Sequence, residues 1–182
     1  MPELRMKTPE EIAQMREKSV AQAKVIHATH AVCEELPADR LQYIRSCAAD
    51  GDAKILVKCN DPLELHAFVS NWNCDRGVEP LLEVLKNRAC DAGTALWLYW
   101  GNDPYFYTRY ATIDDASDDE ERVMFDFFRI IEHRMACNDF ATSRVPFDPQ
   151  PWIETKYHNA TWAIRKIPAY MFITIVPTKQ VT

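Results

Sequence analysis

Apolar residues recur at intervals of three and four along most of the chain, and this spacing predicts a mainly α-helical protein. The first helix is expected to begin after Thr8, because Thr8, Pro9 and Glu11 match a capping box with a proline at the first helical position. Apolar positions continue at helical spacing to Cys33, and Pro37 ends the run. Similar patterns predict helices over 38–49, from Asn60 or Asp61 to about Trp72, over 78–88, and, as a buried helix, over 94–100.

The most clearly specified helix follows an acidic run. Ser117 and Glu120 fit a second capping box, and the acidic residues around them would lie at the positive end of the helix dipole. The apolar positions of this helix are spaced by three and four residues and comprise Met124, Phe127, Phe128, Ile131 and Met135. By contrast, the run 53–59 fits either a strand or a short helix.

One short phrase occurs twice in the middle of the chain. Cys74-Asp75-Arg76-Gly77 recurs as Cys90-Asp91-Ala92-Gly93, and these phrases hold two of only four glycines. An Asp two residues before a Gly at a helix entrance is typical of a helix cap or an Asx turn. We therefore interpret Asp75, Gly77, Asp91 and Gly93 as structural turn residues that start two successive helices, and not as a catalytic carboxylate pair.

The C-terminal region has a different pattern. Prolines interrupt the chain after Asn138, and the stretch 162–167 fits one short helix. Ala169–Val176 is rich in β-branched and aromatic residues and predicts a strand, whose neighbour could be 55–58, 105–111 or the same segment of a second copy. The expected fold is a single, compact multi-helix domain over 1–182, with a helical core at 8–150 and a C-terminal extension at 151–182.

Composition narrows the classes of function. Hydrophobic residues make up 47% of the 182 residues, as in ordinary folded proteins. The net charge of −6 disfavours binding to nucleic acid, because phosphate neutralisation drives that affinity. No apolar run approaches the ~20 residues that a membrane helix needs, and the N-terminal residues lack the apolar core of a signal peptide. We therefore expect a cytoplasmic protein with reduced cysteines and no membrane association.

Candidate chemistry in the central region is sparse. The cysteines and His66 are not arranged in the closely spaced pairs of a zinc site, so we expect no metal and no cofactor. A cysteine nucleophile is an alternative, because Cys74 and Cys90 each precede a helix start and His66 is available as a base. The chain also lacks the glycine-rich loops that bind phosphates.

A surface for a protein partner is the favoured alternative. Aromatic residues are frequent at interface hot spots, and carboxylates steer a basic partner during association. Both kinds of residue follow one another in the stretch 105–121. The predicted contact residues are Tyr105, Tyr107, Tyr110, Asp114, Asp115, Asp118 and Asp119.

The central residues resemble a bacterial family known only as a domain of unknown function, DUF4274. The resemblance is carried by Leu65-His66, Asn71-Trp72-Asn73-Cys74-Asp75-x-Gly77, Leu85 with Asn87, and Cys90-Asp91-x-Gly93-Thr94-Ala95-Leu96. This chain has Cys74 where the family typically has an aromatic residue. The family implies no activity, but small acidic proteins of this kind are similar to the immunity proteins that neutralise toxins exchanged between bacteria.

The sequence therefore predicts a cytoplasmic protein-binding inhibitor, an immunity protein that blocks a toxin by occluding its basic or catalytic surface. Two other hypotheses remain open. One is a small enzyme that uses Cys74 or Cys90 with His66. The other is a structural subunit that forms a homodimer through 169–176.

Overall fold

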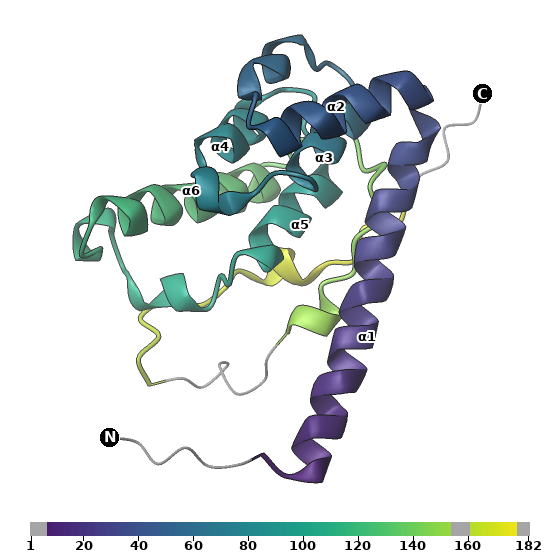
Figure 1. The fold of residues 1–182 in the computed structure, drawn as a ribbon. Helices are drawn as coiled ribbons and strands as arrows, with labels where there is room; N and C mark the ends of the chain where they lie inside the picture. Colours follow the sequence, from purple (N-terminus) through teal and green to yellow (C-terminus); the bar gives the residue numbers. More distant parts are fainter. Residues whose placement is uncertain (1–6, 154–160, 178–182) are drawn as a thin grey trace.

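The computed structural model describes residues 7–153 and 161–177, and this part of the chain is built almost entirely of helices (Figure 1). The prediction of a mainly α-helical fold is confirmed. The α-helices are α1 (Pro9–Ala31), α2 (Ala38–Asp50), α3 (Pro62–Val69), α4 (Glu79–Lys86), α5 (Ala92–Gly101) and α6 (Asp119–Ala136). Short 3₁₀ helices connect or follow them: η1 (Val32–Glu35), η2 (Ala53–Lys58), η3 (Cys74–Arg76), η4 (Phe106–Arg109), η5 (Ile113–Asp115), η6 (Gln150–Trp152) and η8 (Ala169–Phe172).

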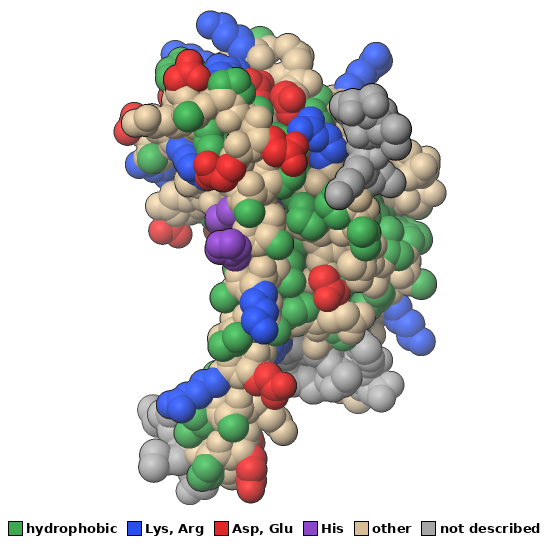
Figure 2. Space-filling view, turned by 90° about the vertical axis from the view of Figure 1, so that its right-hand side faces the viewer, with side chains coloured by type: hydrophobic (Ala, Val, Ile, Leu, Met, Phe, Trp, Pro, Cys, Tyr) green, Lys and Arg blue, Asp and Glu red, His purple; other side chains and the backbone are tan. Residues whose placement is uncertain are grey.

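Helix α1 begins as its capping residues predict. The Thr8 hydroxyl accepts a hydrogen bond from the Glu11 backbone amide at 3.2 Å, and the Thr8 amide donates to the Glu11 carboxylate at 2.7 Å. The apolar positions of the helix are nevertheless exposed, Ile12 at 41% and Met15 at 50%. The N-terminal half of α1 extends away from the rest of the molecule, as Figure 2 shows. The helix is buried only near its C-terminal end, at Thr29.

The core lies around α3 and α5, whose side chains are almost all buried. Helix α3 packs against α2, and α5 packs against α6. Large aromatic side chains fill the centre, with the Tyr99 ring 5.2 Å from the Phe128 ring. The same hydrophobic core includes Cys33 of η1 and Met171 of η8. The core therefore joins η1, which follows the first helix, to η8 in the C-terminal segment.

Helix α6 starts one residue later than the sequence pattern suggests. Asp118 is the cap, and its carboxylate accepts a hydrogen bond from the Glu121 amide at 2.9 Å. Ser117 instead donates its amide and its hydroxyl to the Glu121 carboxylate, at 2.8 and 2.6 Å. The predicted apolar positions do face the core, since Phe127, Phe128 and Ile131 are fully buried. Earlier in the chain, the ambiguous run 53–59 forms the 3₁₀ helix η2.

The predicted C-terminal strand Ala169–Val176 is wrong. Its first half forms η8, and only an isolated bridge pairs Ile175 with Phe147, through hydrogen bonds of 3.1 and 2.8 Å. The Trp100 indole donates to the Met171 carbonyl at 2.9 Å, which leaves that backbone unavailable to a neighbouring strand. The stretch 162–167 is not helical either, because the amides of Ile164 and Arg165 both donate to the Thr108 carbonyl.

No helix within residues 7–153 and 161–177 combines the length and the apolar composition needed to cross a bilayer.

Candidate functional site

The two Asp-x-Gly turns differ in structure, although their sequences are alike. At the second turn the Asp91 side chain is fully buried and caps α5 by accepting a hydrogen bond from the Gly93 amide at 2.8 Å. It also accepts from the Thr142 hydroxyl at 2.5 Å and from the amides of Arg144 and Val145 at 2.6 and 3.2 Å. One carboxylate therefore holds the 142–145 segment against the start of α5.

Gly93 and Thr94 complete this junction. A Cβ atom at Gly93 would lie 1.9 Å from the Val145 carbonyl oxygen, so only glycine fits. The Thr94 hydroxyl lies 3.1 Å from Nδ1 of His66, and both residues are fully buried. His66, Asp91, Gly93 and Thr94 thus hold α3, α5 and the 142–145 segment together.

At the first turn, Asp75 does not cap a helix, contrary to our interpretation. Asn73 accepts a hydrogen bond from the Asp75 amide at 3.0 Å, and α4 begins only at Glu79 without a side-chain cap. Gly77 has a φ of +95°, which favours glycine, and its carbonyl accepts a hydrogen bond from the Trp72 indole at 2.9 Å. The Asp75 side chain remains exposed at the molecular surface.

This first turn forms one side of a groove whose volume is about 800 Å³. The opposite side is the N-terminal half of α6, and η4 contributes an aromatic ring. Four carboxylates line the groove, two from each side: Asp75 and Glu79, and Asp119 and Glu120. The apolar part of the lining comprises Val78, Tyr107, Val123 and Met124. We refer to this feature as the acidic groove.

Two of the seven predicted contact residues line the acidic groove, namely Tyr107 and Asp119. Tyr107 is half-buried, with its ring 4.9 Å from that of Phe128. Burial, together with the negative charge of Glu121, raises the pKa of Tyr107 to about 12. The hydroxyl of Tyr107 is therefore neutral and able to donate a hydrogen bond to a partner at physiological pH.

The other five predicted contact residues do not line the groove. Tyr105 and Tyr110 are 6% and 7% exposed, so their rings support the fold. Asp115 accepts hydrogen bonds from the amides of Ala111 and Thr112, and these bonds lower the pKa of its carboxyl. Asp118 caps α6, and Asp114 is exposed outside the groove.

Sequence reasoning missed Glu79 and Glu120, and assigned Asp75 only to a turn. Glu79 and Glu120 each lie in the first turn of a helix, where a carboxylate is explained by the helix dipole alone. Their convergence on one groove depends on how α4 and α6 pack, which no local pattern in the sequence reveals.

The residues of the cysteine hypothesis lie in unfavourable surroundings for a nucleophile. Cys90 is fully buried, and burial raises the pKa of its thiol to about 12. Cys74 is exposed, but partial burial of its sulfur and the nearby Asp75 raise its pKa as well. Burial lowers the pKa of His66 to about 3, and its Nδ1 is already engaged with Thr94. A high thiol pKa leaves little thiolate at neutral pH, which argues against this alternative.

Metal binding finds no support in the described part of the chain. Residues 7–153 and 161–177 contain no group of three or more His, Cys, Asp or Glu side chains placed to hold an ion.

Comparison with known families places the acidic groove inside a recognised domain. Residues 60–136 match the model of a family described as a domain of unknown function, DUF4274. This span runs from the start of α3 to the end of α6 and contains both Asp-x-Gly turns and all the groove residues named above. Helices α1 and α2 and the C-terminal segments lie outside it. Searches of curated proteins and of solved structures give no match.

Proposed function

We propose that this protein is a binding module that inhibits a basic protein partner by occlusion, as cytoplasmic immunity proteins do. The observation that carries the proposal is the acidic groove, which is lined by carboxylates from two separate helical segments. A Lys or Arg side chain entering the groove would meet charge on both sides and apolar contacts from Val78 and Met124. The carboxylates would attract a basic partner at long range, and the apolar side chains would pack against it once it is bound.

The groove carboxylates have few competing partners within the chain. Asp119 forms an ion pair with Arg122 at 2.9 Å, but this pair is exposed and contributes little to stability. Asp75 does not cap a helix and makes no ion pair with the described residues. Among the described residues, a basic partner that binds at Asp75 and Asp119 therefore competes with one exposed ion pair, Asp119 with Arg122.

The alternative of a homodimer through 169–176 is less well supported. Met171, in the middle of this segment, is fully buried against the protein's own core. The exposed large apolar side chains of the segment are those of the later residues Ile173 and Val176, at 43% and 73%. Since the backbone forms η8 and not a strand, edge-to-edge pairing with a second copy would require it to rearrange.

The binding step is tested by titrating the isotope-labelled protein with a short Lys/Arg peptide and following backbone amide shifts by NMR. We expect the largest shifts at Gly77, Val78 and Glu120, and no shifts with the same peptide carrying Gln in place of Lys and Arg. Shifts spread evenly over all acidic surfaces would contradict a role for the groove.

The inhibitory step requires a cellular measurement. Cells that are killed by the product of the neighbouring reading frame should grow when this protein is produced with it. Persistent killing, or a neighbouring product without toxicity, would contradict the immunity role while leaving the binding result intact.

A further inference from the structure

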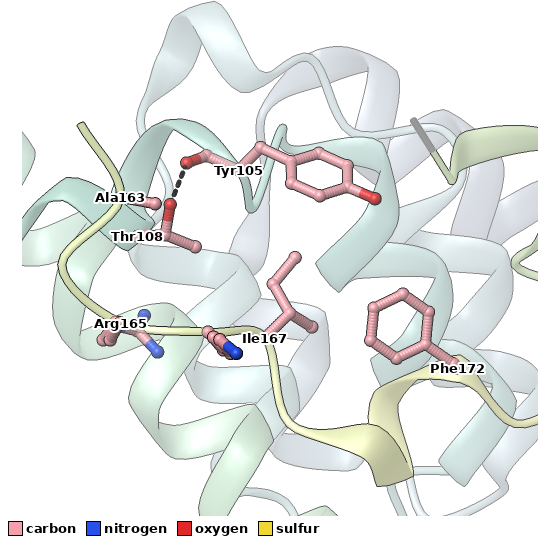
Figure 3. Close-up of a pocket in the computed structure, with 7 residues that line it drawn as sticks. Tyr105, Thr108, Ala163, Arg165, Ile167 and Phe172 are labelled. Atoms are coloured by element: carbon pink, nitrogen blue, oxygen red, sulfur yellow. Dashed lines mark hydrogen bonds between the residues drawn. The ribbon is translucent and has the colours of Figure 1, made fainter. Parts of the chain in front are cut away.

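A second cavity lies away from the acidic groove, between η4 and the C-terminal segment (Figure 3). Its volume is about 260 Å³, slightly below the range of about 300–1,000 Å³ for drug-sized ligands, so it suits only a compact molecule. Figure 3 shows Tyr105, Ile167 and Phe172 arranged around the open space, with Thr108 and Arg165 on one side. Lys166 also lines the cavity. The lining is thus mainly apolar, and its two cationic side chains are the neighbours Arg165 and Lys166.

The walls of this cavity are held in place by the core. The Trp100 ring lies 5.9 Å from the ring of Tyr105 and 5.3 Å from that of Phe172. Its indole nitrogen also holds the backbone of Met171, at 2.9 Å. On the other side, the Thr108 carbonyl accepts hydrogen bonds from the amides of Ile164 and Arg165, at 2.9 and 3.0 Å. A cavity with walls fixed in this way is preorganised, which lowers the entropic cost of binding a ligand.

Among the described residues, cationic groups outnumber carboxylates beside this cavity, although the chain as a whole is acidic. Arg165 contacts both carboxylate oxygens of Glu132, at 2.9 and 3.0 Å, and Glu132 is only 1% exposed. Arg129 pairs with the same carboxylate, so two guanidinium groups share one negative charge. Lys166 adds a further positive charge and forms no ion pair with the described residues. The Nε atom of Arg165 is buried and lacks a hydrogen-bond partner in the described part of the chain.

We propose that this cavity binds a small apolar carboxylate, a ligand with a compact hydrocarbon or aromatic body and one carboxyl group. The body would occupy the space between Tyr105, Ile167 and Phe172, where it loses contact with water. The carboxylate would lie beside Arg165 and Lys166, where it balances their positive charge. A phosphate ester fits less well, because it brings more charge and more acceptor oxygens than this largely apolar lining can satisfy.

The test uses phenylacetate as the probe and phenylacetamide as its neutral counterpart of the same shape. Titration calorimetry on the full chain should show phenylacetate binding about tenfold more tightly than phenylacetamide, because only the carboxylate gains charge-assisted hydrogen bonds. Lys166→Gln should weaken phenylacetate binding several-fold and leave phenylacetamide unchanged. The matched control Lys58→Gln removes an exposed lysine elsewhere and should change neither affinity.

A cavity-filling variant separates the site from general surface charge. Ala163→Leu adds a side chain at the edge of the cavity and should abolish binding of both probes while the thermal transition stays cooperative. As a second measurement that needs no variant, the Trp100 indole NMR signal should shift with phenylacetate. The proposal is overturned if phenylacetate does not bind in the millimolar range, if both probes bind equally, or if Lys58→Gln weakens binding as much as Lys166→Gln. None of these results bears on the acidic groove, because the two cavities share no lining residue.

Discussion

A Cβ atom added at Gly93 would lie 1.9 Å from the carbonyl oxygen of Val145. The backbone of the 142–145 segment therefore rests directly against the first turn of α5, at the position where the second Asp-x-Gly phrase begins the helix. This contact explains why the phrase contains glycine although Gly93 itself has an ordinary helical backbone.

Gly93→Ala should lower the free energy of unfolding by about 2–3 kcal/mol, because the obstacle is backbone that cannot rotate away. The matched control is Gly101→Ala in the same helix, where an added Cβ meets nothing within 4 Å. That change should leave stability unchanged or raise it by up to about 1 kcal/mol. Denaturant titration of both variants is the measurement, and equal effects at the two glycines would refute the close approach at Gly93.

The two aspartates of the repeated phrase should respond differently to the same substitution. Asp91→Asn replaces one of two carboxylate oxygens that accept from the 142–145 segment and should cost about 2–3 kcal/mol of unfolding free energy. Asp75→Asn changes an exposed side chain that caps no helix and should stay within about 0.5 kcal/mol of the wild-type value. A comparable loss in both variants would mean that the two turns are structurally equivalent after all.

Local patterns in the sequence were sufficient to locate most helices, but they were insufficient to predict which side chains lie at the surface. Thr8 and Glu11 fix the start of α1 by hydrogen bonds within one turn, so their pattern can be read from the chain. The exposure of Ile12 and Met15 cannot be read from the chain, because helical spacing shows which side chains share a face of the helix but not whether another element covers that face. The strand predicted at 169–176 failed for a related reason, since β-propensity reflects packing against neighbouring strands, and here Trp100 binds the backbone instead.

The candidate site shows the same limit. Tyr105 and Tyr110 were expected at the surface because aromatic residues are frequent at interfaces, yet both are buried. Asp119 was identified because it lies in the acid-rich stretch 114–121, whereas Glu79 is distant in sequence from the α6 residues that it joins in the groove. A groove formed by the packing of separate helices has no signature in any one segment.

Stability should fall in acid because His66 is buried in its neutral form. Its pKa is about 3 in the folded protein and 6.5 in an unperturbed chain. Between these values the unfolded chain binds a proton that the folded protein does not bind, so stability is greatest above pH 6.5 and declines as the pH falls. The contribution is up to about 1.4 kcal/mol per pH unit. Burial also lowers the pKa of His30, which acts in the same direction.

Unfolding free energies measured from pH 7 down to pH 5 check this prediction. His66→Asn, which keeps a polar group beside Thr94, should have a shallower dependence on pH than the wild-type protein, whatever its stability at pH 7. The exposed histidine His133 provides the control, and His133→Gln should keep the wild-type slope. Identical slopes for wild type and His66→Asn would show that His66 does not remain neutral when the protein is folded.

The thiols should separate into two reactivity classes. Cys74 and Cys137 are exposed, whereas Cys33, Cys47, Cys59 and Cys90 are buried. Iodoacetamide should modify only the first two in the native protein, as measured by mass spectrometry, and Cys74 no faster than free cysteine because its pKa is raised. A native Cys74 or Cys90 that reacts much faster than free cysteine would support the enzyme hypothesis in place of the binding module.

The central claim, that the acidic groove receives a basic partner, is tested most directly by two charge reversals of equal size. Glu79→Lys with Glu120→Lys alters both sides of the groove, and Asp114→Lys with Asp126→Lys alters exposed carboxylates outside its lining. Each pair of substitutions changes the net charge from −6 to −2, since every reversal adds two charges. Circular dichroism should confirm that both variants keep the helical fold.

The measurement is the association rate of a labelled Lys/Arg peptide at low and at physiological ionic strength. The groove variant should associate about tenfold more slowly than wild type, because the steering charges at the binding site are reversed. The control variant should lose about twofold or less, and this loss should disappear at the higher ionic strength. If the two variants slow association equally at both ionic strengths, the peptide is responding to overall charge and the acidic groove is not its binding site.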